Sequence, residues 1–282
     1  MIRRDDLGAA VPVPRPPRRV VSLVPSLTET VASVAPGALI GATDYCVHPP
    51  DLDVVRVGGS KYPVVAEVRR LAPDLVLANG EESRPQDVAE LRAHGIPVWV
   101  TAAPATVPEA LGSLRRLLRE VFDVAPPAWW RTAASNWARL PSVRARAVIP
   151  VWRRPWVVLG PDTFAGDVLR RLGVANACEG DPSEGAPADG DRYPRPSLDE
   201  LRGLFRDGAA DLVVLPDEPY AFHASDGPEA FPGMPAALIS GRHLTWHGPS
   251  LAEAAAVLRA ALDPVLDRIA DAGDAARSAS AE

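Results

Sequence analysis

The sequence predicts an α/β fold of two similar lobes with mostly parallel sheets, joined by a single long linker helix, with a ligand cleft between the lobes. Two observations predict it. Short β-branched runs alternate with helical patterns along the chain. The order of these segments also repeats, since an offset of 137 residues carries Val21 onto Val158, Val76 onto Val213 and Glu81 onto Glu218. A period this long indicates two related lobes rather than a solenoid.

The first lobe is predicted over residues 18–122, after a flexible lead-in at 1–17 that is charged and then proline-rich. Short apolar runs such as "RVVSLV" and "DLVLAN", bounded by Pro, Gly or Asp, are typical of buried strands. The predicted strands are 19–24, 38–43, 74–79 and 97–101, and the predicted helices are 26–34, 63–71, 84–94 and 107–121.

A linker helix is predicted over residues 123–145. The "APP" motif favours a helix start, because proline suits the first turn. Trp130 and Trp137 lie two turns apart on one helical face, where we interpret them as packing residues.

The second lobe is predicted over residues 146–270, followed by a frayed, flexible tail at 271–282. Its predicted strands are 156–160, 211–216 and 236–240, and its predicted helices include 163–172, 197–206 and 250–270. The segments "PWVVLG" and "DLVVLP" repeat the apolar runs of the first lobe. This repetition is what makes the two lobes similar in kind.

Composition excludes several classes of protein. The chain has 282 residues, 47% apolar and 23% charged, as expected for a globular protein of one large domain or two lobes. A net charge of −6 argues against nucleic-acid binding. Cys46 and Cys178 are too few for a disulfide framework and lack zinc-site spacing. No stretch reaches the roughly 20 apolar residues of a membrane span, so we expect no membrane insertion, and we expect a monomer.

Ligands collect at the carboxyl ends of strands in open parallel sheets, so the residues that follow each strand are the candidate contacts. Aromatic walls with a few polar groups are typical of a small-molecule pocket. Lys61 is a candidate as the only lysine of the chain, and Trp152 because it lies near the entry to the second lobe. The full set of predicted ligand contacts is Ser26, Tyr45, Lys61, Glu81, Trp152, Glu218, Tyr220, Phe222, Trp246 and His247.

The stretch "TDYCVHPP" (43–50) admits three interpretations: a nucleophile centre, a metal site or the lip of a pocket. An alternative to a binding protein is therefore a cytoplasmic enzyme or sensor that uses Cys46, His48 or carboxylates of the cleft. His243 and His247, four residues apart, are a weak metal pair. The sequence has no G-x-S-x-G, phosphate-loop or H-E-x-x-H motif, so we assign no catalytic or metal-binding residue.

Three segments together resemble the amino-terminal lobe of helical-backbone (class III) substrate-binding proteins of ABC importers. They are "RRVVSLVPSLTETVASVAPGALIGATDYCVHPPD", "RVGGSKYP" and "LAPDLVLANGEE". The second half fits less sharply, through "DTFAGDVLRRLGVAN" and "PSLDELRGLFRDGAADLVVLPDEPYAF", so that the resemblance covers about residues 18–265. It is strongest to the cobalamin-binding branch, within a family that also takes haem and ferric siderophores.

The resemblance implies a ligand rather than a required cofactor: a corrinoid or a ferric chelate held in the cleft. It makes Tyr45 a ligand contact and Cys46 a small buried residue that shapes the turn. It also implies an ABC permease as partner, docked through carboxylates for which Glu82, Asp199 and Glu200 are candidates. The sequence as given has neither an export signal nor a lipid-attachment cysteine. We therefore expect a cytoplasmic protein, or a periplasmic one if the chain begins further upstream.

Overall fold

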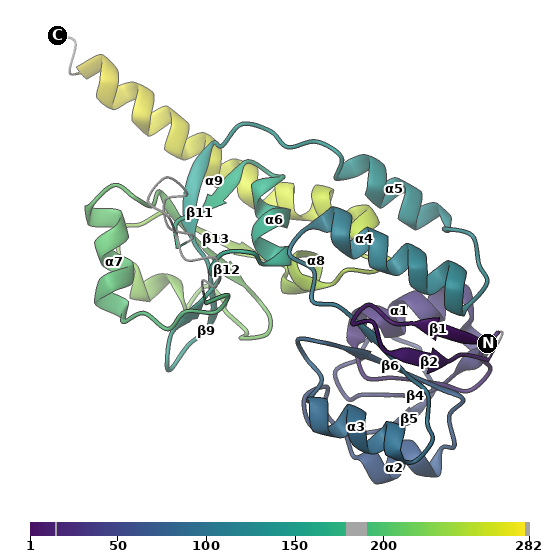
Figure 1. Ribbon diagram of the computed structural model, residues 1–282. Helices are drawn as coiled ribbons and strands as arrows, with labels where there is room; N and C mark the ends of the chain where they lie inside the picture. Colours follow the sequence, from purple (N-terminus) through teal and green to yellow (C-terminus); the bar gives the residue numbers. More distant parts are fainter. Residues whose placement is uncertain (15, 179–190, 280–282) are drawn as a thin grey trace. The chain divides into compact units, whose positions relative to one another are not determined.

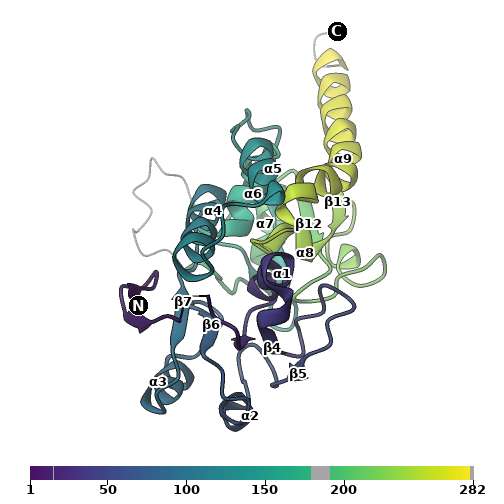
Figure 2. The ribbon, with the colours of Figure 1, turned by 90° about the vertical axis from the view of Figure 1, so that its right-hand side faces the viewer.

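The computed structural model describes residues 1–14, 16–178 and 191–279, shown in Figure 1 and Figure 2. The chain divides into two compact units. The first unit comprises Met1–Pro104, Pro108–Ala134 and Trp246–Leu251, and the second comprises Ala105–Val107, Ser135–Thr245 and Ala252–Glu282. Each unit is built on a parallel sheet with helices, which confirms the predicted two-part α/β fold.

The first unit holds a five-stranded parallel sheet in the order β5-β4-β3-β6-β7. Its strands are β3 (Val20–Ser22), β4 (Leu39–Ala42), β5 (Val55–Arg56), β6 (Leu75–Asn79) and β7 (Val98–Thr101). The helices associated with it are α1 (Pro25–Val34), a 3₁₀ turn (Pro36–Ala38), α2 (Val65–Arg70), α3 (Pro85–Ala93), α4 (Val107–Arg116), which continues as a π-helical turn (Leu117–Val121), and α5 (Ala128–Asn136).

Helices cover both faces of this sheet because successive strand residues point to opposite sides. Val20 is buried in one core with side chains of α1 and α4, whereas Val21 is buried in a second core with side chains of α2 and α3. Figure 1 shows α2 and α3 together on the face away from α1. A parallel sheet covered on both sides needs strands that are apolar throughout, which explains the unbroken run "RVVSLV".

The amino-terminal residues form a hairpin instead of the predicted flexible lead-in. β1 (Ile2–Arg4) pairs antiparallel with β2 (Ala10–Pro12). Val11 and Val13 are buried in the same core as Val20. The prediction was wrong because "VPVP" was interpreted by its prolines alone, whereas its alternating valines give a strand with one buried face.

The second unit holds a four-stranded parallel sheet in the order β11-β8-β12-β13. Its strands are β8 (Ala145–Val148), β11 (Val174–Asn176), β12 (Leu212–Pro216) and β13 (Ala236–Ile239), and β9 (Pro150–Trp152) forms a separate antiparallel hairpin with β10 (Val157–Val158). Its helices are α6 (Phe164–Arg170), α7 (Leu198–Arg206), a 3₁₀ turn (Pro228–Ala230), α8 (Gly241–Thr245) and α9 (Leu251–Ala279).

The strand orders β4-β3-β6-β7 and β11-β8-β12-β13 correspond one to one. The 137-residue offset carries β6 onto β12, where Val76 and Val213 occupy equivalent places. It does not carry β3 onto its counterpart. Val21 pairs with Val76, but the residue that pairs with Val213 is Val148 of β8, and Val158 lies in the β9–β10 hairpin. The sequence match of 19–24 with 156–160 was therefore wrong, because this hairpin is inserted between β8 and α6.

Two further predictions are corrected. The linker helix predicted over 123–145 covers only Ala128–Asn136, since Asp123 adopts a left-handed φ of 58° before it and Pro141 follows it. The predicted tail is helical as far as Ala279 because α9 continues without a break, while residues 280–282 lie outside the described residues. Within the described part of the chain, no helix has both the length and the apolar composition that a membrane crossing requires.

Candidate functional site

The carboxyl ends of the first sheet carry an exposed aromatic and basic surface. Tyr45 follows β4 and is 65% exposed. A Cβ atom built on Gly59 would lie 3.5 Å from the Tyr45 ring, so the loops after β4 and β5 meet here. Lys61 and Tyr62 are exposed on the same loop as Gly59, and the Arg84 guanidinium lies 4.6 Å from the centre of the Tyr62 ring. These loops can offer ring faces and a cation to a ligand.

Cys46 lies beneath this surface and is fully buried. Its Sγ lies 3.0 Å from Thr28 Oγ1 and 3.1 Å from Thr43 Oγ1. Arg56 donates to the carbonyl oxygens of Thr43 and Cys46, both at 2.9 Å, and so holds the turn closed. Burial raises the pKa of the Cys46 thiol, and a buried, protonated thiol is a poor nucleophile. The prediction that Cys46 is a small buried residue that shapes the turn is confirmed, and its use as a nucleophile is not supported.

The segment Trp246–Leu251 belongs to the first unit and lies against the start of α1. A Cβ atom on Gly248 would approach the Ser26 carbonyl oxygen to 2.8 Å, so only glycine permits this contact. Ser26 and Trp246 are buried, and Trp246 meets the His48 ring edge-on at 5.5 Å between ring centres. As placed, these three side chains support the surface that carries Tyr45 rather than extend it.

Two adjacent acids follow β6. Glu81 is anchored by its backbone, whose amide donates to Asn79 Oδ1 at 2.8 Å. Burial raises the pKa of Glu82 to about 7, and the neighbouring Glu81 carboxylate adds to the rise. The Glu82 side chain is nevertheless accessible to water, which screens part of this effect. Burial lowers the pKa of His247, against the opposing influence of its backbone hydrogen bond and of Glu81.

In the second unit an aromatic cluster follows β12. Trp152, on the β9–β10 hairpin, is 46% exposed and meets the Tyr220 ring edge-on at 5.7 Å. Tyr220 contacts Phe222 at 4.6 Å, and Phe222 in turn stacks on Trp156 at 6.1 Å. Phe222 itself is only 3% exposed. The cluster therefore has a solvent-facing part, Trp152 and Tyr220, on a buried base.

Arg153 fixes the cluster from the side. Its guanidinium forms ion pairs with Asp226 and, at 2.5 Å, with Glu229, and it lies 5.3 Å from the centre of the Trp156 ring. The Tyr220 hydroxyl donates to Asp226 Oδ2 at 2.7 Å. Because Asp226 binds both Arg153 and Tyr220, the half-buried Tyr220 ring is held in one orientation.

Glu218 lies at the root of the same loop. Burial raises its pKa, and the adjacent Asp217 adds to the shift while Arg242 opposes it. A Cβ atom on Gly241 would come within 2.6 Å of the Glu218 carbonyl oxygen, so glycine is required where α8 begins. The Gly241 amide donates to Asp217 Oδ1 at 2.6 Å.

Ser240, His243 and Glu253 form a hydrogen-bonded chain of the kind that hydrolases use. His243 Nδ1 lies 2.8 Å from Ser240 Oγ, and Nε2 lies 3.2 Å from Glu253 Oε1. A hydrolase also needs amide donors for an oxyanion beside the nucleophile. Here the next amide, that of Gly241, already donates to the Asp217 carboxylate. The negative charge at that position opposes acyl transfer, so the arrangement does not support a hydrolase.

The carboxylates predicted to dock on a permease differ in whether they are free to face solvent or are committed to a backbone hydrogen bond within the chain. Asp199 is exposed in the first turn of α7 and lies 3.4 Å from Arg206. Glu200 closes a capping box: its carboxylate accepts from the Ser197 amide at 2.7 Å, and this hydrogen bond lowers the pKa of Glu200. Its carboxylate is thus committed to the helix start, whereas Asp199 and Glu82 face solvent.

Comparison with known proteins was made on both sequence and structure. No protein-family model matches the chain. An 88-residue segment is 30% identical to a vitamin B12-binding protein of Vibrio cholerae, and it covers 30% of this chain and 32% of that relative. The match thus spans about a third of the length of the curated relative.

The solved structures match over nearly the whole chain. The periplasmic haem-binding protein BhuT, in complex with two haems, gives a TM-score of 0.69 at 23% identity over 88% of this chain and 98% of that one. The vitamin B12-binding protein BtuF of Vibrio cholerae gives 0.66 at 17% identity over 89% and 99%. The fold is that of periplasmic haem- and vitamin B12-binding proteins. The resemblance drawn from the sequence motifs is confirmed.

On this fold, the predicted contacts fall into three groups by exposure. Tyr45, Lys61, Glu81 and Trp152 are exposed, and Glu218, Tyr220 and His247 are half-buried. Ser26, Phe222 and Trp246 are buried. The prediction that both sheet edges border one cleft stays a prediction. Among the residues that the structure describes, no group of three or more His, Cys, Asp or Glu side chains could hold a metal ion.

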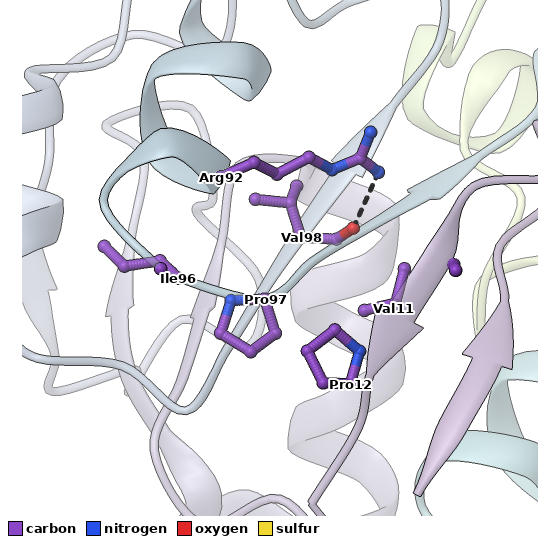
Figure 3. A pocket seen from close by; sticks show the side chains of 8 residues that line it. Val11, Pro12, Arg92, Ile96, Pro97 and Val98 are labelled. Atoms are coloured by element: carbon purple, nitrogen blue, oxygen red, sulfur yellow. Dashed lines mark hydrogen bonds between the residues drawn. The ribbon is translucent and has the colours of Figure 1, made fainter.

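A pocket of about 220 Å³ lies elsewhere, at the amino-terminal end of β7 (Figure 3). It is lined by β2 and by the residues before β7, with Arg92 along one side. None of the predicted contacts reaches it.

Sequence reasoning missed two residues that matter at the candidate site. Tyr62 could have been found, because it follows Lys61 in a glycine-rich loop after a strand. Asp226 carries no such signal, since its partner Arg153 is distant in sequence and the pairing exists only in the folded chain.

Proposed function

We propose that this chain is a non-enzymatic binding protein of the ABC-importer type, whose ligand is a flat metal chelate such as a haem or a corrinoid. The observation that carries the proposal is the pair of an exposed Trp152 and a half-buried Tyr220, which Arg153 and Asp226 hold in place. Solved proteins of this fold are named for haem and vitamin B12. An oriented aromatic pair suits a large planar ligand because little side-chain entropy remains to be lost on binding.

In the first unit we assign the second set of contacts to Tyr45 and Lys61. The Tyr45 ring is exposed and backed by the Gly59 loop. Lys61 supplies a cation for the carboxylates of a haem or for the amide and phosphate oxygens of a corrinoid. A ferric siderophore wraps its oxygen ligands around the iron and is not flat, so the test includes it as a second kind of metal chelate.

The test is a titration of the purified chain with haem, cyanocobalamin and a ferric siderophore, read by quenching of tryptophan fluorescence. We expect one of the three to saturate, and Trp152→Ala and Tyr45→Ala each to weaken its binding by about tenfold or more. Leu140→Ala is the control, because Leu140 is 58% exposed and belongs to neither surface. The absence of a saturable response to all three would overturn the ligand class.

A cytoplasmic enzyme or sensor is the disfavoured alternative. Its main candidate, Cys46, is buried and has a raised pKa. The proteins matched are named as binding proteins, and the solved ones as periplasmic. We therefore place this chain outside the cytoplasm in the proposal.

We further propose that Glu82 and Asp199, one exposed carboxylate in each unit, dock on arginines of an ABC permease. Replacing both by alanine should leave the ligand titration unchanged and lower uptake of the ligand by cells. Unchanged uptake in the double variant would contradict the docking role of Glu82 and Asp199, and it would leave the proposal about the ligand unaffected.

A further inference from the structure

β7 is one of the two end strands of the first sheet, so its outer side is an edge of that sheet. The carbonyl oxygens of Pro97 and Thr101 accept from Val76 and Gly80 and so face inward, towards β6 and the residue after it. Alternate residues of a strand direct their backbone groups to opposite sides. The amides and carbonyls of Val98 and Val100 and the amide of Ala102 therefore face outward, where a further strand would pair. The Ala102 carbonyl instead accepts from Asn79 Nδ2 of β6 at 3.1 Å, and the Val98 carbonyl accepts from the Arg92 guanidinium at 2.9 Å.

Within the described residues, no strand pairs with the outer edge of β7. Side chains and one turn form hydrogen bonds to this edge instead. The Asp6 amide donates to the Val100 carbonyl at 3.1 Å, and the Val100 amide donates to Asp5 Oδ2 at 3.4 Å. The Ala102 amide donates to Asp6 Oδ2 at 3.3 Å. These three hydrogen bonds come from the turn that joins β1 to β2.

Two buried carboxylates anchor this turn. Asp5 is 2% exposed; its Oδ1 accepts from the amides of Leu7 and Ala9, and its Oδ2 accepts from Arg92 at 2.8 Å. Asp6 accepts from the Ser113 hydroxyl and, at 2.5 Å, from Arg116 of α4. A buried carboxylate is tolerated only when it is paired in this way, so the two aspartates specify where the hairpin sits.

Beyond this turn, the hairpin contacts the first unit through two buried valines. Val11 and Val13 reach the core, but a pocket of about 220 Å³ separates β2 from the start of β7 (Figure 3). The hydrogen bonds to the outer edge at Val100 and Ala102 thus come from the Asp5–Asp6 turn, while Val11 and Val13 attach the hairpin to the core.

We propose that residues 1–13 are a strap that seals the edge of β7 and keeps the chain monomeric, and that without it this edge pairs with the same edge of a second copy. Open strand edges associate readily, especially when they are β-branched and aromatic, as "VWVT" is. Antiparallel pairing of β7 with β7 would be two-fold symmetric and self-complementary. The proposal is independent of the ligand.

The first experiment compares the whole chain with a variant that lacks residues 1–13, by size-exclusion chromatography with light scattering over a range of concentrations. We expect the whole chain to stay monomeric and the shortened variant to dimerise increasingly with concentration while its circular dichroism is retained. A synthetic peptide of residues 1–13 should return the variant to monomer. A folded variant that stays monomeric at every concentration would overturn the proposal.

A second measurement decides the case if the shortened variant does not fold. In the whole chain, Asp5→Asn with Asp6→Asn should speed hydrogen exchange of the Val100 and Ala102 amides by about tenfold or more, because the anchors of the seal are weakened. Asp51→Asn with Asp53→Asn is the matched control, since both aspartates are exposed. Unchanged exchange at Val100 and Ala102 would overturn the strap.

Discussion

The two units share one strand order but present different surfaces at their carboxyl ends. In the first unit the loops after β4 and β5 leave Tyr45 and Lys61 open to solvent. In the second, Arg153 and Asp226 lock Tyr220 into an aromatic cluster. Four strands of the two sheets correspond in order, so the difference comes from the connections between strands and helices. A repeated scaffold therefore does not repeat its site.

The origin of the difference is one insertion. In the first unit the chain passes from β3 directly into α1, whereas in the second the β9–β10 hairpin intervenes between β8 and α6. The hairpin brings Trp152 against Tyr220. It supplies the second unit with an aromatic side chain for which the first unit has no counterpart at the equivalent place.

The largest expected effect is a loss of stability when a buried ring beneath the aromatic cluster is removed, compared with removal of its exposed ring. Phe231 is 1% exposed and contacts Trp156 and Phe205. Phe231→Ala should lower the free energy of unfolding by about 3–5 kcal/mol through the cavity it leaves. Trp152→Ala should cost less than about 1 kcal/mol because the ring is half-exposed. Urea denaturation measures both free energies of unfolding. Equal losses in the two variants would contradict the division of the cluster into a buried base and an exposed part.

Arg153→Met should have the next largest effect, because it leaves Asp226 and Glu229 without their cation. We expect a loss of about 1–3 kcal/mol in unfolding free energy, and weaker ligand quenching as Tyr220 loses its fixed orientation. Arg206→Met is the control, since its pair with Asp199 is long and exposed and should contribute less than about 0.5 kcal/mol. If both substitutions cost the same, Arg153 does not fix the cluster.

The cysteines, one in each unit, sharpen the comparison further. Cys46 is fully buried with a raised pKa, whereas Cys178 is half-buried. In a Cys178→Ser variant, iodoacetamide should label native Cys46 slower than urea-unfolded Cys46 by roughly tenfold or more. In a Cys46→Ser variant, the remaining thiol should show a smaller difference. Fast native labelling of Cys46 would restore the enzyme alternative.

The smallest expected effect is the pH dependence that Glu82 confers. Its pKa is raised to about 7, so the folded state disfavours the charged form. The stability associated with protonated Glu82 is fully present below the ordinary glutamate pKa and is lost as the pH rises towards about 7. Glu82→Gln should therefore gain stability over the wild type at about pH 8 and lose that advantage at about pH 4. Water around the exposed side chain keeps the difference small. Parallel urea midpoints at both pH values would measure it, and a larger gain at the lower pH would contradict the sign.

Strands with long apolar runs were predictable. β6, β7, β12 and β13 lie within one residue of their predicted bounds, because "DLVLAN" and "DLVVLP" are buried on both faces. β8 was missed because Arg144 precedes it and Arg146 interrupts its short apolar run, and the hairpin of β1 and β2 was missed because prolines alternate with its buried valines. In both cases the core decides the strand, and a short window cannot show which face is covered.

The sequence by itself determined the α/β class, the repeat of the lobes and the group of aromatic residues that follow the strands, because these depend on local periodicity and on strand order. The tertiary structure alone decided which of those residues are exposed. Phe222 and Trp152 were equal candidates until packing buried the first and left the second in solvent. Likewise, Asp226 and Arg153 became partners only when the β9–β10 hairpin met the loop after β12. Exposure and pairing depend on neighbours that are remote along the chain, and the fold alone brings these together.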